Sequence, residues 1–391
     1  MPTVSVLMSV HNGAAFLRPA LQSLLSQTFD DFELVVVDDA STDETPAMLA
    51  EYQARDDRIR ILRNETNRQL PVSLNRGLEA CRASLVARAD ADDVYEPQRI
   101  ARQVEFMRRH PEVGLVSSNV RAIDTSGRVL FETHHPVEHA GIRLRMNYRC
   151  PINHPATMFR RDLVAEVGGY NPDAVWAEDI ELWKRLVRHT RFANVETPLV
   201  RYRQHETSET NTRPDAGDQL SLEVRQELLA RYLDQQVSPA ETDALHALLR
   251  RRSTRHPRAV VERGIRVAEK LRDEVHRRRP SLRREFEGEL FDAICSQSTK
   301  HSAVDRRFGL RLMTRAAKVP PRHRGRATGP KKIPAMAAGK RLQRGHHPAA
   351  DVVALQGLPS CWLSQEPRFG SAFSDAIVRC GPAGGGSRAT R

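Results

Sequence analysis

Cysteine and long apolar runs are both scarce in this chain of 391 residues. The five cysteines are scattered, odd in number and without a CxxC pair, which argues against a disulfide framework and a cysteine-based metal site. No apolar run is long enough to predict a membrane-spanning helix, and no signal peptide precedes the first predicted strand. We therefore expect a cytoplasmic protein with reduced thiols.

Two glycine-rich phosphate-binding motifs are also absent. The first predicted strand, residues 4–10, is followed by His11-Asn12-Gly13 without a GxGxxG motif, and GxxxxGK[ST] occurs nowhere in the chain. Rossmann dehydrogenases and P-loop enzymes hold phosphate with the backbone of these glycines. If this chain binds a nucleotide, a metal ion and side chains must hold the phosphates instead.

An acidic cluster is the most informative feature that is present. Asp90, Asp92 and Asp93 lie within four residues, directly after the apolar segment 85–87. Carboxylates at the end of a buried strand are costly unless a positive group neutralises them, and a divalent cation that holds phosphate does so. The cluster therefore predicts a metal–nucleotide site, with a solvated helix-capping turn as the alternative.

The surrounding pattern predicts an α/β fold. Apolar segments that indicate buried strands alternate with segments of helical spacing. This alternation predicts a Rossmann-like, mostly parallel sheet with helices on both faces. The predicted strands are 4–10, 32–37, 58–62 and 85–89.

Polar residues end three of these strands. Ser9 and His11 end the first, Asp39 follows the second, and the acidic cluster follows the fourth. Ligands of such sheets bind beyond the carboxyl ends of the strands. We therefore expect these groups to converge on one nucleotide site.

In these segments the chain resembles the inverting family-2 glycosyltransferases of the GT-A fold, in their non-processive bacterial form. No QxxRW signature, which is usual in the processive synthases of the family, follows Asp179. The resemblance implies a metal-dependent hexosyltransferase that moves a sugar from a nucleotide diphosphate to a hydroxyl acceptor by single displacement. It covers roughly residues 1–210, in segments 4–12, 26–29, 33–43, 74–78, 88–93, 153–161, 167–170, 177–183 and 202–205.

The resemblance assigns the nucleotide-binding residues. Asp39 would accept the imide proton of a uracil or thymine base, so UDP and dTDP sugars are the favoured donors. Ser9, His11 and Asn12 would line the base pocket, although His11 is also explained as a histidine that caps a turn. Asp90 would lie near the ribose or the donor sugar.

The resemblance also assigns the metal and catalytic residues. Asp92 would bind Mg²⁺ or Mn²⁺ that bridges the diphosphate, with Asp93 supporting it and His205 as a further metal or diphosphate ligand. Asp179, with Glu178 beside it, would be the general base that takes the proton of the acceptor hydroxyl. Ordinary helix capping is the alternative for this acidic pair.

One residue departs from the family pattern. Gln69 stands where the family commonly has glycine, which puts the choice of nucleotide in doubt. From the family we expect a glycan or lipid-linked glycan acceptor of surface polysaccharide synthesis. The enzyme would then touch the inner face of the membrane peripherally, and no specific nucleic acid is expected as a partner.

Three regions are predicted along the chain. They are a catalytic domain over 1–212, a helical extension over 213–317 and a disordered, low-complexity tail over 318–391. The tail has thirteen Lys or Arg against three Asp or Glu and so accounts for +10 of the net charge of +12. Membrane contact, nonspecific nucleic-acid binding and non-native sequence remain open as explanations of the tail.

Two other functions remain as alternatives. A nucleotidyltransferase would share the α/β nucleotide site and the metal, but it should carry a glycine- and lysine-rich loop after the first strand. A non-catalytic binding protein would use the basic tail and keep only a vestigial nucleotide site. The joint presence of Asp39, Asp92 and Asp179 argues against that second alternative.

Overall fold

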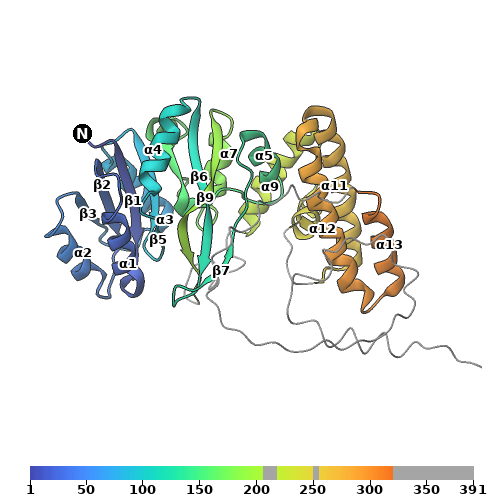
Figure 1. The fold of residues 1–391 in the computed structure, drawn as a ribbon, viewed down its shortest axis with the longest axis horizontal. Coiled ribbons are helices and arrows are strands. Elements are labelled where there is room, and N and C mark those ends of the chain that lie inside the picture. The colour runs from blue at the N-terminus through green and yellow to red at the C-terminus, as the bar shows by residue number, and fades with distance from the viewer. Residues whose placement is uncertain (206–217, 250–254, 320–391) are drawn as a thin grey trace, which may run out of the picture. The chain divides into compact units, whose positions relative to one another are not determined.

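The computed structural model describes residues 1–205, 218–249 and 255–319 (Figure 1). The predicted tail, except for Lys318 and Val319, lies outside the described residues. So do the first residues of the predicted helical extension, 213–217.

The described chain begins with four parallel strands. They have the order β3-β2-β1-β4, and the crossovers between them contain helices α1, α2 and α3. The elements are β1 (Val4–Val10), α1 (Ala14–Leu25), β2 (Phe32–Asp38), α2 (Thr45–Gln53), β3 (Ile59–Arg63), α3 (Leu70–Ala80) and β4 (Leu85–Asp90).

Alternate side chains of the central strands enter two separate cores. Met8 of β1 packs in one core with Leu17 of α1, and Leu7 packs in the other with Leu74 of α3. All four side chains are fully buried. Because the side chains of a strand alternate between its faces, helices must cover both faces of the sheet. The predicted α/β fold is confirmed.

The second half of the sheet is mixed. β9 pairs with β6 in parallel, whereas β8 pairs antiparallel with β4 and β6, and β5 pairs antiparallel with β9. These pairings extend the sheet to nine strands, with β7 paired to β6 beside the main path. The elements are β5 (Val94–Tyr95), α4 (Arg99–Arg109), β6 (Val113–Ile123), β7 (Val129–Glu132), α5 (His139–Met146), a 3-10 turn (His154–Ala156), β8 (Met158–Arg160), α6 (Arg161–Glu166), α7 (Glu178–Leu186) and β9 (Arg191–Arg203).

The described residues after position 217 are helical, as predicted. Ser238 and Glu241 form a capping box, in which the Ser238 N–H donates to Glu241 Oε2 (3.0 Å) and the Glu241 N–H to Ser238 Oγ (3.3 Å). Leu144 and Tyr148, from the segment around α5, pack in the same core as these helices. The helices are α9 (Asp218–Leu233), α10 (Pro239–Leu249), α11 (Arg258–Arg278), α12 (Arg283–Ser302) and α13 (Arg306–Ala316).

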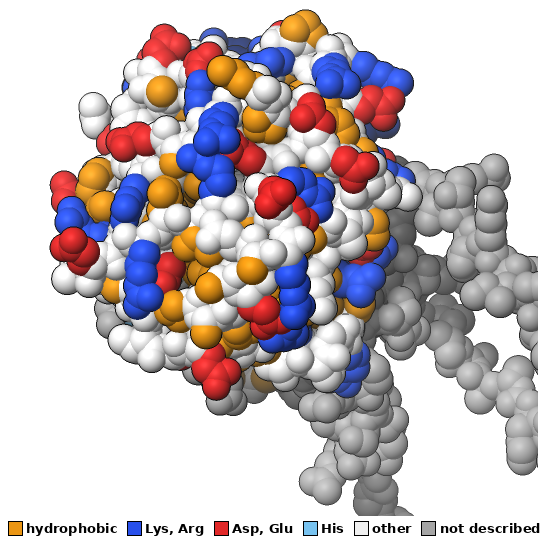
Figure 2. Space-filling model, turned by 90° about the vertical axis from the view of Figure 1, so that its left-hand side faces the viewer, with side chains coloured by type: hydrophobic (Ala, Val, Ile, Leu, Met, Phe, Trp, Pro, Cys, Tyr) orange, Lys and Arg blue, Asp and Glu red, His pale blue; other side chains and the backbone are white. Residues whose placement is uncertain are grey.

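Two surface properties of the described residues bear on function. None of their helices combines the length and hydropathy that crossing a membrane requires. On the face drawn in Figure 2, Lys and Arg side chains are interspersed with Asp and Glu. That face therefore lacks the continuous basic stripe with which proteins follow a nucleic-acid backbone.

Candidate active site

The carboxyl ends of the parallel strands meet at one edge of the sheet, as the sequence predicts. Val10 at the end of β1 lies opposite Asp38 of β2, and Ser9 lies opposite Asp90 of β4. The Asp39 N–H continues this register by donating to the Val10 carbonyl oxygen (2.8 Å). The polar residues that follow these strands are therefore neighbours in space.

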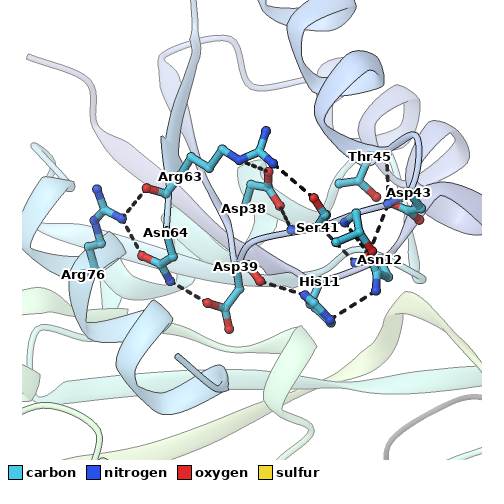
Figure 3. A network of polar contacts seen from close by, with 11 residues as sticks. His11, Asn12, Asp38, Asp39, Ser41, Asp43, Thr45, Arg63, Asn64 and Arg76 are labelled. Atoms are coloured by element: carbon cyan, nitrogen blue, oxygen red, sulfur yellow. Dashed lines mark hydrogen bonds and ion pairs between the residues drawn. The ribbon is translucent and has the colours of Figure 1, made fainter. Parts of the chain in front are cut away.

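Asp39 lies at this edge with one oxygen occupied and one open. Its side chain is 3% exposed, and Oδ1 accepts hydrogen bonds from Asn64 Nδ2 (2.6 Å) and from the Arg68 N–H (2.8 Å). No residue of the described ranges donates to Oδ2. The carboxylate is thus held in one orientation with an acceptor oxygen left for a ligand N–H (Figure 3).

Asn64 is a site residue that the sequence analysis missed. Its Nδ2 also donates to Ser73 Oγ (2.8 Å), and its Oδ1 accepts from the Arg76 guanidinium. These contacts fix the side-chain amide that orients Asp39 (Figure 3). Its position directly after β3 is the same signal that marked the other strand ends, so a consistent search would have found it.

His11 and Asn12 form a hydrogen-bonded turn beside Asp39. His11 Nδ1 lies 2.7 Å from the Asp39 carbonyl oxygen, which can only accept, so Nδ1 is the donor. His11 Nε2 then accepts from Asn12 Nδ2 (3.2 Å). Asn12 has a positive φ of 51° and accepts from the Thr42 N–H (2.8 Å). Both side chains are exposed at the site, whereas Ser9 is half-buried in β1.

Gln69 has a conformation that explains the glycine of the family pattern. Its φ is 69° and its ψ 159°, a region that is almost restricted to glycine. The neighbouring Arg68 N–H is one of the two donors to Asp39. The strained residue therefore belongs to the loop that orients the Asp39 carboxylate.

The three carboxylates of the acidic cluster come together after β4. One oxygen from each of Asp90, Asp92 and Asp93 lies within 4.8 Å of the others. His205 Nε2 lies 2.9 Å from Asp92 Oδ2, so the structure also brings the predicted histidine ligand to the cluster. Arg203, on the same strand end, donates its backbone N–H to Asp93 Oδ1 (2.8 Å).

Asp93 has an oxygen that lacks a partner. The side chain is fully buried, and no residue of the described chain hydrogen-bonds to Oδ2. Burial and repulsion from the neighbouring carboxylates raise the pKa of Asp93 well above its usual range. Burial and repulsion from Asp90 also raise the pKa of Asp92, against the opposing effect of His205. Three neighbouring carboxylates, one of them with an oxygen that lacks a partner, together with one imidazole fit Mg²⁺ or Mn²⁺.

Two buried arginines and a buried tyrosine pack beside the acidic cluster. Arg88 Nη2 lies 2.5 Å from Asp90 Oδ1, and its side chain is fully buried. The Tyr95 hydroxyl donates to the Asp90 carbonyl oxygen (2.8 Å), and Arg99 stacks on the Tyr95 ring at 4.7 Å. The sequence analysis gave these residues no role, because only the fold shows that they face the cluster.

Glu178 and Asp179 begin helix α7, as predicted. Glu178 Oε1 lies 3.7 Å from His154 Nδ1, and His154 Nε2 lies 2.9 Å from the Tyr170 hydroxyl. Burial lowers the pKa of His154 well below its usual range, so this histidine is neutral. His154 is therefore a buried neighbour of the acidic pair.

Asp179 lies at the N-terminus of α7, and charges of both signs act on its carboxyl group. Its Oδ1 accepts from the Ile180 N–H (2.6 Å). Burial raises the pKa of Asp179, the positive charge of Arg225 on α9 lowers it, and the negative charge of Asp90 raises it. A carboxylate with a raised pKa is suited to accept a proton near neutral pH. The electrostatic effect of Asp90 links this helix end to the acidic cluster.

Fold and site together show an α/β protein with a cluster of carboxylates at the carboxyl edge of its parallel strands. Comparison with known proteins names the class. The model described as glycosyl transferase family 2 matches residues 5–168. The O-antigen biosynthesis glycosyltransferase WbnJ of Escherichia coli is 30% identical over 213 residues, which are 52% of this chain and 81% of that protein.

Two further matches agree. A UDP-Gal:alpha-D-GlcNAc-diphosphoundecaprenol beta-1,3-galactosyltransferase of Escherichia coli is 30% identical over 203 residues, 51% of this chain and 73% of that protein. The crystal structure of S. aureus TarS 1–349 in complex with UDP-GlcNAc shares the fold, with a TM-score of 0.51 and 17% identity over 81% of this chain and 91% of that chain. The chain belongs to glycosyl transferase family 2, and it is a glycosyltransferase of GT-A fold.

Proposed function

We propose that the chain is an inverting, metal-dependent hexosyltransferase that uses a UDP or dTDP sugar. The observation that carries this proposal is the gathering of Asp90, Asp92 and Asp93 at the same sheet edge as the open oxygen of Asp39. A nucleotide sugar needs a recognition site for its base and positive charge at its diphosphate. This edge offers the first directly and the second through a bound cation.

The acidic cluster would hold the metal. Asp92 and His205 are the proposed ligands, and Asp90 and the open oxygen of Asp93 would complete or support the site. A bound Mg²⁺ or Mn²⁺ would neutralise the charge that develops on the departing nucleotide diphosphate. Arg88 would keep the Asp90 carboxylate in place.

Asp39 would select the base. Its Oδ2 would accept the N3–H of uracil or thymine, while Asn64 and the Arg68 N–H hold Oδ1. Adenine has no ring N–H at the corresponding position, so a carboxylate acceptor favours the uracil and thymine diphosphates over ADP. His11, Asn12 and Ser9 would line the pocket.

Asp179 would act as the general base. In a single displacement with inversion, it takes the proton of the acceptor hydroxyl as that oxygen attacks the anomeric carbon, and the bond to the diphosphate oxygen breaks on the opposite face. The backbone N–H of Ile180 orients the carboxylate. Glu178 would position this helix end through its contact with His154.

The acceptor would be a glycan or a lipid-linked glycan. The names of the two Escherichia coli relatives, which refer to O-antigen and to a diphosphoundecaprenol acceptor, support this class. Such an acceptor would place the enzyme in the cytoplasm, at the inner face of the membrane. Residues 1–212 would carry the catalysis, with 213–317 as a helical extension and 318–391 as a separate tail.

Calorimetry with nucleotides tests the proposal. We expect UDP or dTDP to bind the full-length protein in the presence of Mn²⁺, more weakly without it, and more tightly than GDP or ADP. Asp92→Ala should abolish the metal dependence, whereas Asp162→Ala, at an exposed aspartate of α6, should not. Absence of binding by every nucleotide in the presence of metal would contradict the proposal.

A further inference from the structure

A groove between α10 and α11 carries positive charge that the active site does not use. It has a volume of about 320 Å³ and lies at the start of α10. Arg263, Arg266 and Lys270 line one side and succeed one another at helical spacing, so they share a face of α11. Ser238 and Ala240, at the N-terminus of α10, line the other side.

The two arginines of this groove differ from the other cations of α11. Arg263 and Arg266 have no acidic partner within the described residues. Every other Lys or Arg of the helix forms an ion pair. These pairs are Arg258–Glu262, Lys270–Glu241, Arg272–Asp273, Arg277–Glu274 and Arg278–Glu274.

The acidic residue in the groove does not neutralise the arginines. Glu241 Oε1 lies 3.5 Å from Lys270 Nζ, and Oε2 accepts from the Ser238 hydroxyl (2.9 Å). Hydrogen bonds from Ser238 and the charge of Lys270 lower the pKa of Glu241, so it remains ionised and paired. The Glu241 and Lys270 charges cancel, which leaves two guanidinium groups facing the cavity.

The backbone at the start of α10 adds a hydrogen-bond donor with partial positive charge. Helix α10 begins at Pro239, which has no N–H. The N–H groups of Glu241 and Thr242 donate to Ser238. The Ala240 N–H is therefore the donor of this first turn that remains for an anion, which the helix dipole favours. Ala240 lies in this first turn and lines the groove. Two guanidinium forks and a helix N-terminus suit an anion with several oxygens in different directions, as phosphate has, better than a planar carboxylate.

We propose that this groove binds a phosphate-bearing anion through Arg263 and Arg266, at a site separate from the nucleotide site. The phosphate is carried either by a soluble compound or by the headgroup of an anionic lipid. None of the groove residues belongs to the active site, so this inference stands whether or not the donor is a UDP sugar.

The test compares two double variants of the full-length protein. Arg263→Gln/Arg266→Gln removes the groove cations, and Arg272→Gln/Arg277→Gln removes two paired cations from the same helix. Both variants lose the same net charge and keep the basic tail, so nonspecific attraction to anions changes equally. Arg266→Gln alone, at an exposed side chain, serves as a milder variant if the double change impairs folding.

Binding of inorganic phosphate is measured by calorimetry, and binding to phosphatidylcholine vesicles with and without phosphatidylglycerol by flotation. We expect the groove variant to bind phosphate at least about tenfold more weakly than the control variant, since charge-assisted bonds are lost. Loss of flotation with phosphatidylglycerol identifies the lipid headgroup as the source, whereas loss of phosphate binding alone identifies a soluble compound. Equal binding of phosphate by both variants would overturn the proposal.

Discussion

The orientation of single carboxylates distinguishes the residues of this site from ordinary surface acids. Asp39 has one oxygen occupied by two donors, and Asp93 has one oxygen without a partner in the described structure. Both features leave an acceptor directed at a ligand. Predictions at this scale concern Asp39 and Asp179.

Replacement of Asp39 by Asn should weaken binding of UDP by roughly ten- to a hundredfold. The change removes a charged acceptor for the imide N–H, which is worth about 1.5–3 kcal/mol. Calorimetry in the presence of Mn²⁺ measures the effect. Asp57→Asn, at an exposed aspartate, is the control and should leave the affinity unchanged. An unchanged affinity of Asp39→Asn would exclude Asp39 as the base-recognition residue.

Replacement of Asp179 by Asn should lower kcat by roughly 10²–10⁴-fold, because the general base is lost. Binding of the nucleotide should remain, since Asp179 does not contact the base pocket. Asp173→Asn, an exposed aspartate shortly before α7, provides the control. A variant of Asp179 that turns over normally would disprove its role as the base.

The pH dependence of turnover should report the charge environment of Asp179. The base must be ionised, and burial raises its pKa, so kcat falls as the pH drops through this raised value. Arg225 lowers the pKa of Asp179, and Arg225→Gln should therefore shift the acidic limb of the kcat–pH profile to higher pH. Arg231→Gln on the same helix should leave the limb in place. A shift to lower pH, or none, would contradict this assignment.

Sequence identified the acids of the site but not the groups that orient them. Asp39 and Asp92 stand after buried strands, where a carboxylate is costly, whereas Asp179 was assigned by the resemblance to the family, because an acid at a helix start is also explained by capping. Arg68 contributes only a backbone N–H, which any residue type could supply, and nothing in its side chain indicates that contact.

At the scale of elements, the success of prediction depended on length and burial. The four parallel strands were predicted to within a residue or two, because each has five or more residues and most of them are apolar. β5 and β8 have two and three residues, too few to establish a period. β6 and β9 were not predicted, although they have eleven and thirteen residues; in β9, Thr197 and Pro198 interrupt the apolar pattern, and the pairing with β6 shifts register there.

The turn that begins α3 allows a prediction about stability. Gln69 has a glycine-like conformation, whose strain is worth about 1–3 kcal/mol. Gln69→Gly relieves the strain but adds about 0.5–1 kcal/mol of chain entropy to the unfolded state. We expect a net increase in the free energy of unfolding of about 1 kcal/mol. Chemical denaturation measures it, with Gln53→Gly in α2 as a control that should destabilise.

A lower free energy of unfolding for Gln69→Gly would show that contacts of the Gln69 side chain stabilise the fold by more than its backbone strain destabilises it. The same variant also tests nucleotide choice. If Gln69 only carries strain, the preference between UDP and dTDP should remain as in the natural sequence. A changed preference would make Gln69 a specificity residue.

At the scale of the whole molecule, the proposed metal site predicts that a bound metal ion raises stability. A ligand that binds only the folded state stabilises it by about 2.7 kcal/mol when present at a hundredfold excess over its dissociation constant. Mn²⁺ should therefore raise the unfolding temperature of the natural chain. In Asp93→Asn this gain should be much smaller, whereas the metal-free variant should be at least as stable as the natural chain, because a buried charge has been removed.

Thermal unfolding with and without Mn²⁺ measures both effects. Asp162→Asn, on the exposed side of α6, should show the full gain from the metal. A gain of the same size in Asp93→Asn would mean that the ion binds elsewhere.

The two parts of the site differ in how far apart along the chain their contacting residues lie, and this affects the order in which they can form during translation. The contact between Asp39 and Asn64 spans 25 residues, so the base pocket can close early during translation. The contact between Asp93 and Arg203 spans 110 residues. At a rate of about 5–20 residues per second, the ribosome needs on the order of 5–20 s to deliver that second partner. During this interval the nascent chain has the acidic cluster without Arg203 and His205, so the proposed metal site would be completed after the proposed base pocket.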